Sequence, residues 1–266
     1  MEYIIKSIPF FAIFIIIEYL FDHYGHRGLY SIKDACSNIA CGLIQVMMNF
    51  LFAAIMGFGY IFIYTYAALV HLGHSIYVWI FVFIAVDLCY YIFHRASHRV
   101  ALFWALHVVH HQSEYFNLSV AVRQSGFGGF FSWIFYLPLA FLGVSPEIMA
   151  TSLALNLIYQ FWIHTSLINK CGFFEVVMNT PSHHRVHHGR NPQYIDKNYA
   201  GIFIIWDKLF GTFEPESVKA DYGITKPLES ANPIWANFHV WVALSNQARE
   251  VHGLKNKLLV FLKPPA

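Results

Sequence analysis

IYVWIFVFIAVDLCYYIFHRASH, residues 76–98, joins an apolar segment to a closely spaced pair of histidines. The apolar part, Ile76–Phe93, carries a single carboxylate, Asp87, near its end. Its length is close to the roughly 20 residues with which a helix crosses a bilayer. His94 and His98 follow four positions apart, which places both imidazoles on one helical face. We therefore predict a membrane helix that ends in a metal-binding turn.

Further apolar segments lie on both sides of this stretch. They are Ile4–Phe21, Ile39–Val70, Phe127–Val144 and Ile148–Ile168. The 266 residues are 57% hydrophobic and only 12% charged, whereas soluble domains carry about 25% charged residues. We predict an all-α integral membrane protein with four to five transmembrane helices and a cytosolic helical cap that holds a histidine-rich dimetal site. The segment 39–70 exceeds one span, so it is either one tilted helix or a helix broken near Gly57 and Gly59.

These patterns divide the chain into three parts. Residues 1–75 hold N-terminal membrane helices, and we expect the first to be retained, because DHYGHRGLY after it is a poor cleavage site. Residues 76–235 combine membrane helices with a cap and carry every histidine cluster. Residues 236–266 form a C-terminal segment whose end, KNKLLVFLKPPA, is a candidate interfacial helix.

The distribution of positive charge predicts the orientation of the chain. Arg95, Arg99 and Arg123 lie between the third apolar segment and the pair at 127–168, and more Lys and Arg follow residue 169. Loops rich in Lys and Arg stay in the cytoplasm. We therefore expect a multi-pass protein whose histidine clusters all lie on the cytoplasmic side.

Charge and cysteine content argue against other classes of protein. The net charge of +2 gives no support to a nucleic-acid partner, which requires a strongly basic surface. The four cysteines (Cys36, Cys41, Cys89 and Cys171) form no C-x-x-C pair. Neither a cysteine zinc site nor a disulfide framework is indicated.

Histidine is the most unusual component, because ten of the 16 fall between positions 94 and 188. Beside the first pair, HVVHH (107–111) and HHRVHH (183–188) carry histidines at i, i+3 and i+4, and QFWIH (160–164) ends in another. Burying so many imidazoles without a metal would leave polar nitrogens unsatisfied. The predicted metal ligands are His94, His98, His107, His110, His111, His164, His184, His187 and His188.

The number of imidazoles predicts two metal ions, since nine exceed the four ligands of one tetrahedral zinc. Imidazole binds iron, zinc, copper and nickel, so ligand type alone does not select the metal, and zinc is able to replace iron in purified protein. His183 adjoins His184 but points elsewhere on a helix. We treat it as a candidate ligand or a support for the ligands.

Two other polar side chains are candidates for work at the metal site. Asp87 lies seven residues before His94 on the same face, and we expect it to accept an N–H from a ligand histidine and fix its tautomer. The alternative is an interfacial carboxylate that reaches water. Gln160, one turn before His164, either holds a metal-bound water or bonds a neighbouring helix.

The combined pattern of HX3H, HX2HH, a third-box histidine and a final HX2HH resembles the fatty acid hydroxylase / sterol desaturase superfamily of membrane enzymes. The resemblance implies a non-haem di-iron centre, O2 as oxidant and a hydroxylase-like catalytic domain at 76–235 that oxidises a membrane lipid. Asn117, Asn179 and Asp207 lie in family-like motifs, where we expect them to brace the cap.

Four longer stretches are similar to the ether-lipid-cleaving members of this superfamily. They are SEYFNLSVAVRQS (113–125), YQFWIHT (159–165), NTPSHHRVHHGRN (179–191) and DKNYAGIFIIWDKLFGTFEPE (196–216). This resemblance implies hydroxylation of the carbon next to an ether oxygen, after which the hemiacetal collapses to an aldehyde and a glycerol. It also implies tetrahydrobiopterin as reductant, with another electron donor, such as an electron-donor protein, as the alternative.

Two alternatives stay open at this point. One is a fatty-acyl or sterol hydroxylase or desaturase of the same superfamily, which would share the metal centre. The other is a histidine-rich membrane metal transporter, which requires ligands along a path across the bilayer. The clusters instead lie at the ends of apolar segments on one predicted side, which favours the enzyme.

Overall fold

The computed structural model describes residues 2–265, and its secondary structure is helical. In chain order the elements are α1 (Glu2–Gly25), α2 (Ile32–Tyr66), α3 (Ile76–Arg99), α4 (Ala101–His111), α5 (Leu118–Ala121), α6 (Gly128–Ser132), η1 (Trp133–Tyr136), α7 (Leu137–Phe141), α8 (Pro146–Trp162), η2 (Gly172–Val176), α9 (Pro181–His188), α10 (Ile205–Leu209), α11 (Pro233–Glu250) and α12 (Leu254–Leu262). Within residues 2–265 the β-structure is limited to two isolated bridges, Met178 with Phe203 and Gly189 with Tyr222. The predicted all-α class is confirmed.

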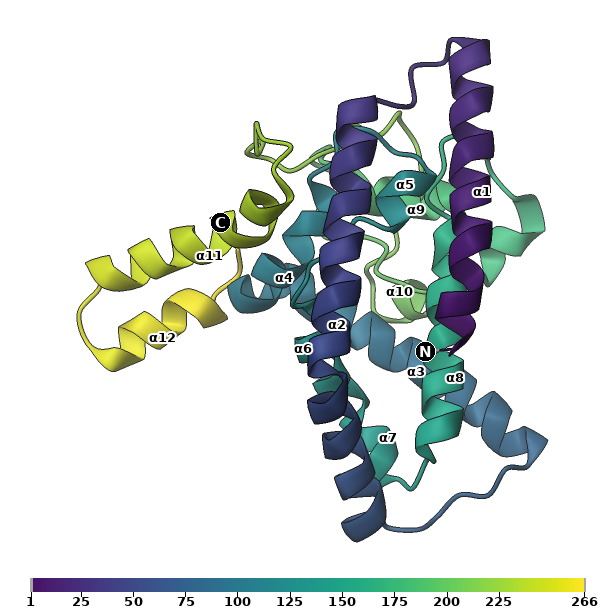
Figure 1. The fold of residues 1–266 in the computed structure, drawn as a ribbon, viewed down its shortest axis with the longest axis vertical. Helices are drawn as coiled ribbons and strands as arrows, with labels where there is room; N and C mark the ends of the chain where they lie inside the picture. The colour runs from purple at the N-terminus through teal and green to yellow at the C-terminus, as the bar shows by residue number, and fades with distance from the viewer. Residues whose placement is uncertain (1, 266) are drawn as a thin grey trace.

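Three helices, α1, α2 and α3, are long and apolar enough to cross a membrane. α1 and α2 lie antiparallel along the long axis of the molecule and are joined at one end by a short loop (Figure 1). Most of their large apolar side chains are exposed. Such a surface is stable where lipid rather than water surrounds the helix, so the chain is a membrane protein.

α2 decides between the two predictions for the long segment 39–70. It is a single helix from Ile32 to Tyr66 and continues without a break through Gly57 and Gly59. A Cβ atom at Gly59 would lie 2.6 Å from the Trp133 ring. Glycine at this position therefore permits close packing against η1 rather than a break in the helix.

The segment 127–168, predicted as two membrane helices, contains shorter helices than expected. Its first half is divided into α6, η1 and α7, and its second half is α8, which has 17 residues. Ser145 caps α8 by accepting a hydrogen bond from the backbone N–H of Ile148 at 3.4 Å, in agreement with the predicted turn. Because these helices are shorter than about 20 residues, residues 2–265 contain three candidate spans by length and composition, against the four to five predicted.

α3 packs against α8 on one side and leads into α4 at its end. Val82 and Val86 of α3 contact Tyr136, Leu139 and Ile148 in a buried apolar cluster. At Val100, with φ −128° and ψ 121°, the backbone leaves helical geometry and α4 begins. This interruption lets the histidines of α3 and α4 approach one another.

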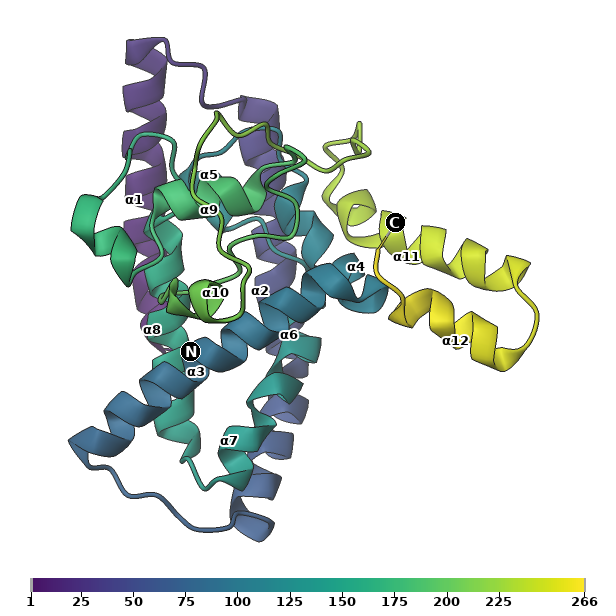
Figure 2. The same ribbon diagram turned by 180° about the vertical axis from the view of Figure 1, so that it is seen from behind.

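The C-terminal third of the chain has two parts, one packed against the bundle and one that leaves it. α9 and α10 lie against the bundle, whereas α11 and α12 form an antiparallel hairpin that projects away from it (Figures 1 and 2). The predicted helix near the C-terminus is thus present as α12. The domain borders at 75/76 and 235/236 stay predictions, and the second falls within α11.

Candidate metal centre

Three helices, α3, α4 and α9, and the turn after α8 bring nine histidines together in two adjacent groups. The five-histidine group consists of His94, His98, His107, His111 and His187, and the four-histidine group of His110, His164, His184 and His188. Within each group, one ring nitrogen from every histidine lies within 4.8 Å of all the others. The groups adjoin, since the rings of His111 and His188 stack with centroids 4.4 Å apart. Every residue predicted as a ligand belongs to one of the two groups.

Within the five-histidine group the Nε2 atoms converge. His107 Nε2 lies 2.9 Å from His94 Nε2 and 3.1 Å from His111 Nε2. The buried Nε2 atoms of His98 and His187 have no hydrogen-bond partner among residues 2–265. Buried polar nitrogens that lack a partner normally indicate a missing ion or water.

The four-histidine group is similarly compact. His110 Nε2 lies 3.1 Å from both His164 Nε2 and His188 Nε2. His184 Nε2 lies 2.9 Å from His164 Nε2. A metal ion with bonds of about 2.0–2.1 Å to two imidazoles at a right angle separates their nitrogens by about 3 Å. These distances match that separation.

Backbone carbonyls orient four of the rings through their Nδ1 atoms. His110 Nδ1 donates to Arg123 O at 3.0 Å, and His164 Nδ1 donates to Gln160 O at 2.7 Å. A neutral imidazole that donates from Nδ1 carries a lone pair on Nε2. The Nε2 atoms of His110 and His164 therefore face each other as two acceptors, which a shared cation would satisfy. The donor set of the four-histidine group fits a metal ion on this ground.

The other two oriented rings belong to the five-histidine group. His94 Nδ1 donates to Tyr199 O at 2.7 Å, and His187 Nδ1 donates to Lys197 O at 2.9 Å. Both carbonyls lie in one segment, residues 196–203, here called the carbonyl loop. A hydrogen bond from the second ring nitrogen fixes the tautomer and orientation of a metal-binding histidine.

Burial keeps these imidazoles uncharged. Removal from water, followed by repulsion among neighbouring rings, lowers the pKa of the His107, His111 and His188 imidazoles well below its ordinary value. Burial also lowers the pKa of His164 to about 3. A neutral imidazole is the form that binds a metal, so the rings are ready for coordination at neutral pH.

The carbonyl loop is held by three residues that were singled out in the sequence. Asp207 accepts hydrogen bonds from the backbone N–H groups of Tyr199 and Ala200, both at 2.8 Å. Asn179 Nδ2 donates to Ala200 O at 2.6 Å, and Asp87 Oδ1 accepts from Ile202 N at 2.7 Å. The bracing role predicted for Asn179 and Asp207 agrees with these contacts.

The prediction that Asp87 accepts an N–H from a histidine was wrong. Its carboxylate accepts hydrogen bonds from Ile202 N, Phe203 N, Trp206 Nε1 and Asn156 Nδ2, and from none of the histidines. The alternative, a carboxylate reaching water, was wrong too, because Asp87 is fully buried. The carbonyl loop connects Asp87 to His94, because the Asp87 carboxylate binds Ile202 N and Phe203 N while Tyr199 O binds the His94 ring.

Gln160, His183 and Asn117 differ in how they relate to the metal groups. Gln160 Nε2 donates to Asn156 Oδ1 at 2.6 Å within α8, while its backbone carbonyl orients His164. The His183 ring lies outside both groups, beside Phe213, with a centroid distance of 5.4 Å. Asn117 caps α5 through Ser119 N and donates to Leu29 O, which ties the loop after α1 to the cap.

Two buried charged residues near the centre were not recognised as site residues in the sequence. Arg123 had entered only through its charge, yet its side chain donates to Val109 O, Ser37 Oγ, Asn38 Oδ1 and Gln112 Oε1 while its carbonyl binds His110. Glu18 lies inside the first apolar segment, Ile4–Phe21. It accepts hydrogen bonds from Tyr30 Oη, Leu118 N and Thr165 Oγ1, the last of these beside His164. Its position inside an apolar segment was the available signal.

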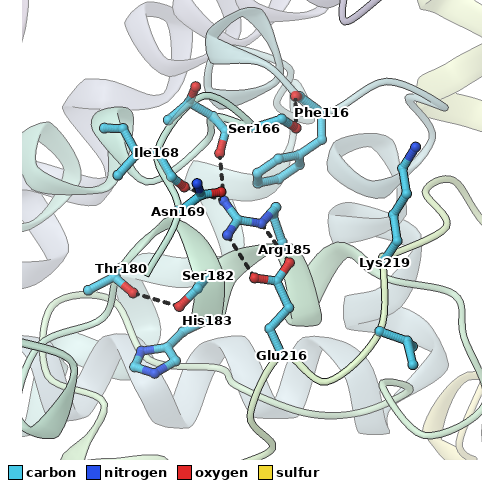
Figure 3. A network of polar contacts seen from close by, with 12 residues as sticks. Phe116, Ser166, Ile168, Asn169, Thr180, Ser182, His183, Arg185, Glu216 and Lys219 are labelled. Atoms are coloured by element: carbon cyan, nitrogen blue, oxygen red, sulfur yellow. Dashed lines mark hydrogen bonds and ion pairs between the residues drawn. The ribbon is translucent and has the colours of Figure 1, made fainter. Parts of the chain in front are cut away.

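Arg185 of α9 forms an ion pair with Glu216 (Figure 3). Arg185 binds both oxygens of Glu216 at 2.7 Å and donates to Ile168 O at 2.6 Å and Thr165 O at 3.2 Å. Such bidentate pairs have a well-defined geometry. Arg185 thereby links α9, which carries His184 and His188, to the segment that follows His164.

Fold and site define a helical membrane protein with a paired polyhistidine centre. The fatty acid hydroxylase family model matches residues 79–212, which is half of the chain and includes every ligand candidate. The chain belongs to the fatty acid hydroxylase family. No solved structure gives a significant match.

Proteins similar over nearly the whole chain include alkylglycerol monooxygenases. Those of Danio rerio and Homo sapiens are each 43% identical over 99% of this chain, which covers 59% and 60% of their own lengths. The chain thus spans about three fifths of these relatives. The ornithine lipid hydroxylase OlsE of Rhizobium tropici is 28% identical over 51% of this chain and 42% of its own. The predicted superfamily and the resemblance to ether-lipid enzymes are confirmed.

Proposed function

We propose that this chain is a di-iron monooxygenase that uses O2 to hydroxylate a C–H bond of a membrane lipid. The convergence of nine imidazoles, eight of them buried and that of His107 half-buried, into two adjacent groups is the observation that carries this proposal. Iron held by these groups would supply the activation of O2, with electrons from tetrahydrobiopterin or another donor. The similarity to alkylglycerol monooxygenases makes an alkylglycerol ether lipid the proposed substrate class.

The chain's own residues would orient and shield the reacting site. Backbone carbonyls at Arg123, Gln160, Lys197 and Tyr199 hold ring nitrogens toward the two centres. Eight of the nine imidazole rings in the two groups are buried, and this burial would limit the access of water to the reacting C–H bond. Keeping water out protects reactive intermediates and strengthens electrostatic interactions inside the site.

For an ether lipid, hydroxylation of the carbon next to the ether oxygen yields a hemiacetal. That hemiacetal breaks its C–O bond to give a fatty aldehyde and a glycerol, and the ether oxygen stays with the glycerol. We propose that the site lies at the cytoplasmic face of a multi-pass protein and that lipid enters sideways from the bilayer. The positive charges flanking the histidine clusters support this orientation.

The transporter alternative is less well supported. Transport would need ligands distributed across the bilayer, whereas the nine ligand atoms form two compact adjacent groups. Similarity to the ornithine lipid hydroxylase also favours lipid hydroxylation over desaturation.

The proposal is tested with the purified chain in lipid nanodiscs, loaded with iron and supplied with a reductant. Incubation with an alkylglycerol under ¹⁸O₂ should give a fatty aldehyde carrying the label, together with free glycerol. A chain that binds two irons per molecule but oxidises no ether, acyl or sterol lipid would refute the proposed activity. A product that gains one oxygen atom without ether cleavage would indicate a different lipid hydroxylation as the activity.

A further inference from the structure

The hairpin of α11 and α12 lies crosswise to α1 and α2, two of the three candidate membrane spans, while the third, α3, is oblique to both (Figures 1 and 2). In both views it projects sideways from the bundle, while α1 and α2 run along the long axis (Figures 1 and 2). Where α1 and α2 cross the bilayer along its normal, a helix that lies across both of them runs along the membrane plane. The hairpin leaves the bundle beside α4, which carries His107, His110 and His111.

Each helix of the hairpin packs one side against the bundle and leaves an apolar stripe uncovered. Val260 and Phe261 of α12 and Leu244 of α11 pack around Ala101 and Ala105 of α4. On the outside, Trp235, Phe238 and Val242 are 43%, 43% and 44% exposed. On α12, the leucines spaced four residues apart are still more exposed: Leu254 is 74%, Leu258 54% and Leu262 58% exposed. Residues with this spacing share one helical face.

The charges of the hairpin complement an anionic surface. Four exposed cations lie on it or at its ends, against one exposed carboxylate, Glu250. The cations are Arg249, Lys255, Lys257 and Lys263. Basic residues beside an apolar face with tryptophan, phenylalanine and leucine are the composition of helices that lie in a lipid interface. Long Lys and Arg side chains reach from such a depth to the phosphates.

We propose that the α11–α12 hairpin lies flat in the headgroup layer of the bilayer. Its apolar stripes would lie below the level of the anionic lipid phosphates, and its lysines would contact those phosphates. The crosswise direction, the uncovered stripes and the positive charge each fit this partner. A second copy of the chain would cover the stripes but gains nothing from the excess of cations, since like charges would meet.

The hairpin also sets the depth of the metal centre, a consequence that rests on the proposed function. Lys263 O accepts a hydrogen bond from Ala101 N at 2.8 Å, at the first residue of α4. At the other end of α4, Gln112 Nε2 donates to Ala236 O at 3.1 Å. α4 is thus attached to the hairpin at both ends, so the position of the hairpin in the headgroups determines which carbon of a lipid reaches the histidine groups.

A spin-label experiment tests the location of the hairpin without any measurement of activity. One cysteine is introduced as Leu258→Cys and, separately, as Asn256→Cys on the opposite face of α12, with Cys36 and Cys171 replaced by serine in both. In nanodiscs that contain phosphatidylglycerol, the label at 258 should be relaxed more by O2 than by a water-soluble nickel chelate, and the label at 256 the reverse. Equal access of the chelate to both labels, or strong coupling between labels of two chains, would overturn the proposal.

A charge variant tests the link to lipid oxidation. Lys255→Gln with Lys257→Gln should move the label at 258 toward water and raise the KM for bilayer lipid several-fold, with iron content unchanged. The matched control, Asn256→Gln, should change neither. If the label reports lipid while the enzyme oxidises nothing, the hairpin proposal stands and the proposed function fails. An unchanged depth and KM in the lysine variant would count against the anionic contact.

Discussion

The residues that decide the chemistry are imidazoles whose second nitrogen is already in use. His94, His110, His164 and His187 each donate from Nδ1 to a backbone carbonyl, which leaves Nε2 to face its group. Backbone carbonyls cannot be exchanged by mutation, so side chains that hold the backbone are the points at which this orientation can be altered. Arg123 and Asp87 are two such side chains.

Replacing His110 with alanine should remove iron from the four-histidine group. His110 Nε2 lies 3.1 Å from two other members, so its loss opens the middle of the group. Activity should fall by more than the roughly 10–100-fold that loss of a ligand-supporting residue costs. Iron per chain, measured by mass spectrometry of the purified protein, checks the effect. His252→Ala, at an exposed histidine outside both groups, is the control, and full activity with half the iron lost would contradict the assignment.

Asp87→Asn should destabilise the protein and weaken metal binding together. An asparagine amide cannot accept at both of its terminal atoms, so at least one donor among Phe203 N, Trp206 Nε1 and Ile202 N loses its partner. An unsatisfied buried donor costs about 1–3 kcal/mol. Thermal unfolding in detergent and iron titration measure the two effects. Asp221→Asn, at an exposed ion pair, should alter neither the melting temperature nor the iron affinity. An unchanged iron affinity in Asp87→Asn would contradict the proposal that the carbonyl loop supports metal binding.

At the scale of elements, short pieces of backbone position the site more than the long helices do. The carbonyl loop is fixed by Asp87 from α3, Asn179 before α9 and Asp207 from α10. α9, only eight residues long, contributes three of the nine clustered histidines, and its Arg185 pairs with Glu216. The candidate spans α1 and α2 contribute no member of either histidine group, but Glu18 binds Leu118 N of α5 and Ser37 binds the Arg123 side chain.

Gly201→Ala should disturb the carbonyl loop. A Cβ atom there would lie 2.8 Å from Asp87 Oδ1, 2.9 Å from the Tyr90 ring and 3.1 Å from Asn156 Oδ1. Overpacking a tight site typically costs about 1–3 kcal/mol. We expect a lower melting temperature and weaker iron binding at the five-histidine group. Gly57→Ala, at a helical glycine whose Cβ would meet open space, should be neutral or stabilising, and equal effects at both sites would refute the steric argument.

At the scale of the whole molecule, an apolar exterior surrounds a cluster of buried bases. The imidazoles of His107, His110, His111, His184, His187 and His188 all have a pKa well below its ordinary value because burial disfavours the charged form. Each depressed pKa couples folding to pH. The unfolded chain takes up protons near pH 6.5, while the folded chain does not.

The metal-free protein should therefore lose stability as the pH falls. Above about pH 7 the histidines are neutral in both states, and stability should vary little. Below about pH 6.5 the unfolded state binds more protons, so its free energy falls relative to that of the folded state. Melting temperatures of metal-free protein between about pH 8 and 5 check the direction. A melting temperature that rises on acidification would contradict the burial of neutral rings, and bound iron should shift the loss to lower pH because proton and metal compete.

The sequence by itself determined the composition of the protein and which histidines gather in the two groups. The shortage of charge required lipid-facing helices, and the spacing of histidines at i, i+3 and i+4 placed them on single helical faces, so all nine members of the two groups were identified without coordinates. Both properties are local, because they depend on neighbours in the chain.

Only the tertiary structure decided how the ligands divide and what holds them. His110 and His111 are adjacent in sequence yet belong to different groups, and Asp87 serves the carbonyl loop rather than a histidine. Arg123 and Glu18 gained their roles from partners dozens of residues away. Such contacts depend on where the chain returns after a turn, and that is set by packing of the whole molecule, not by local periodicity.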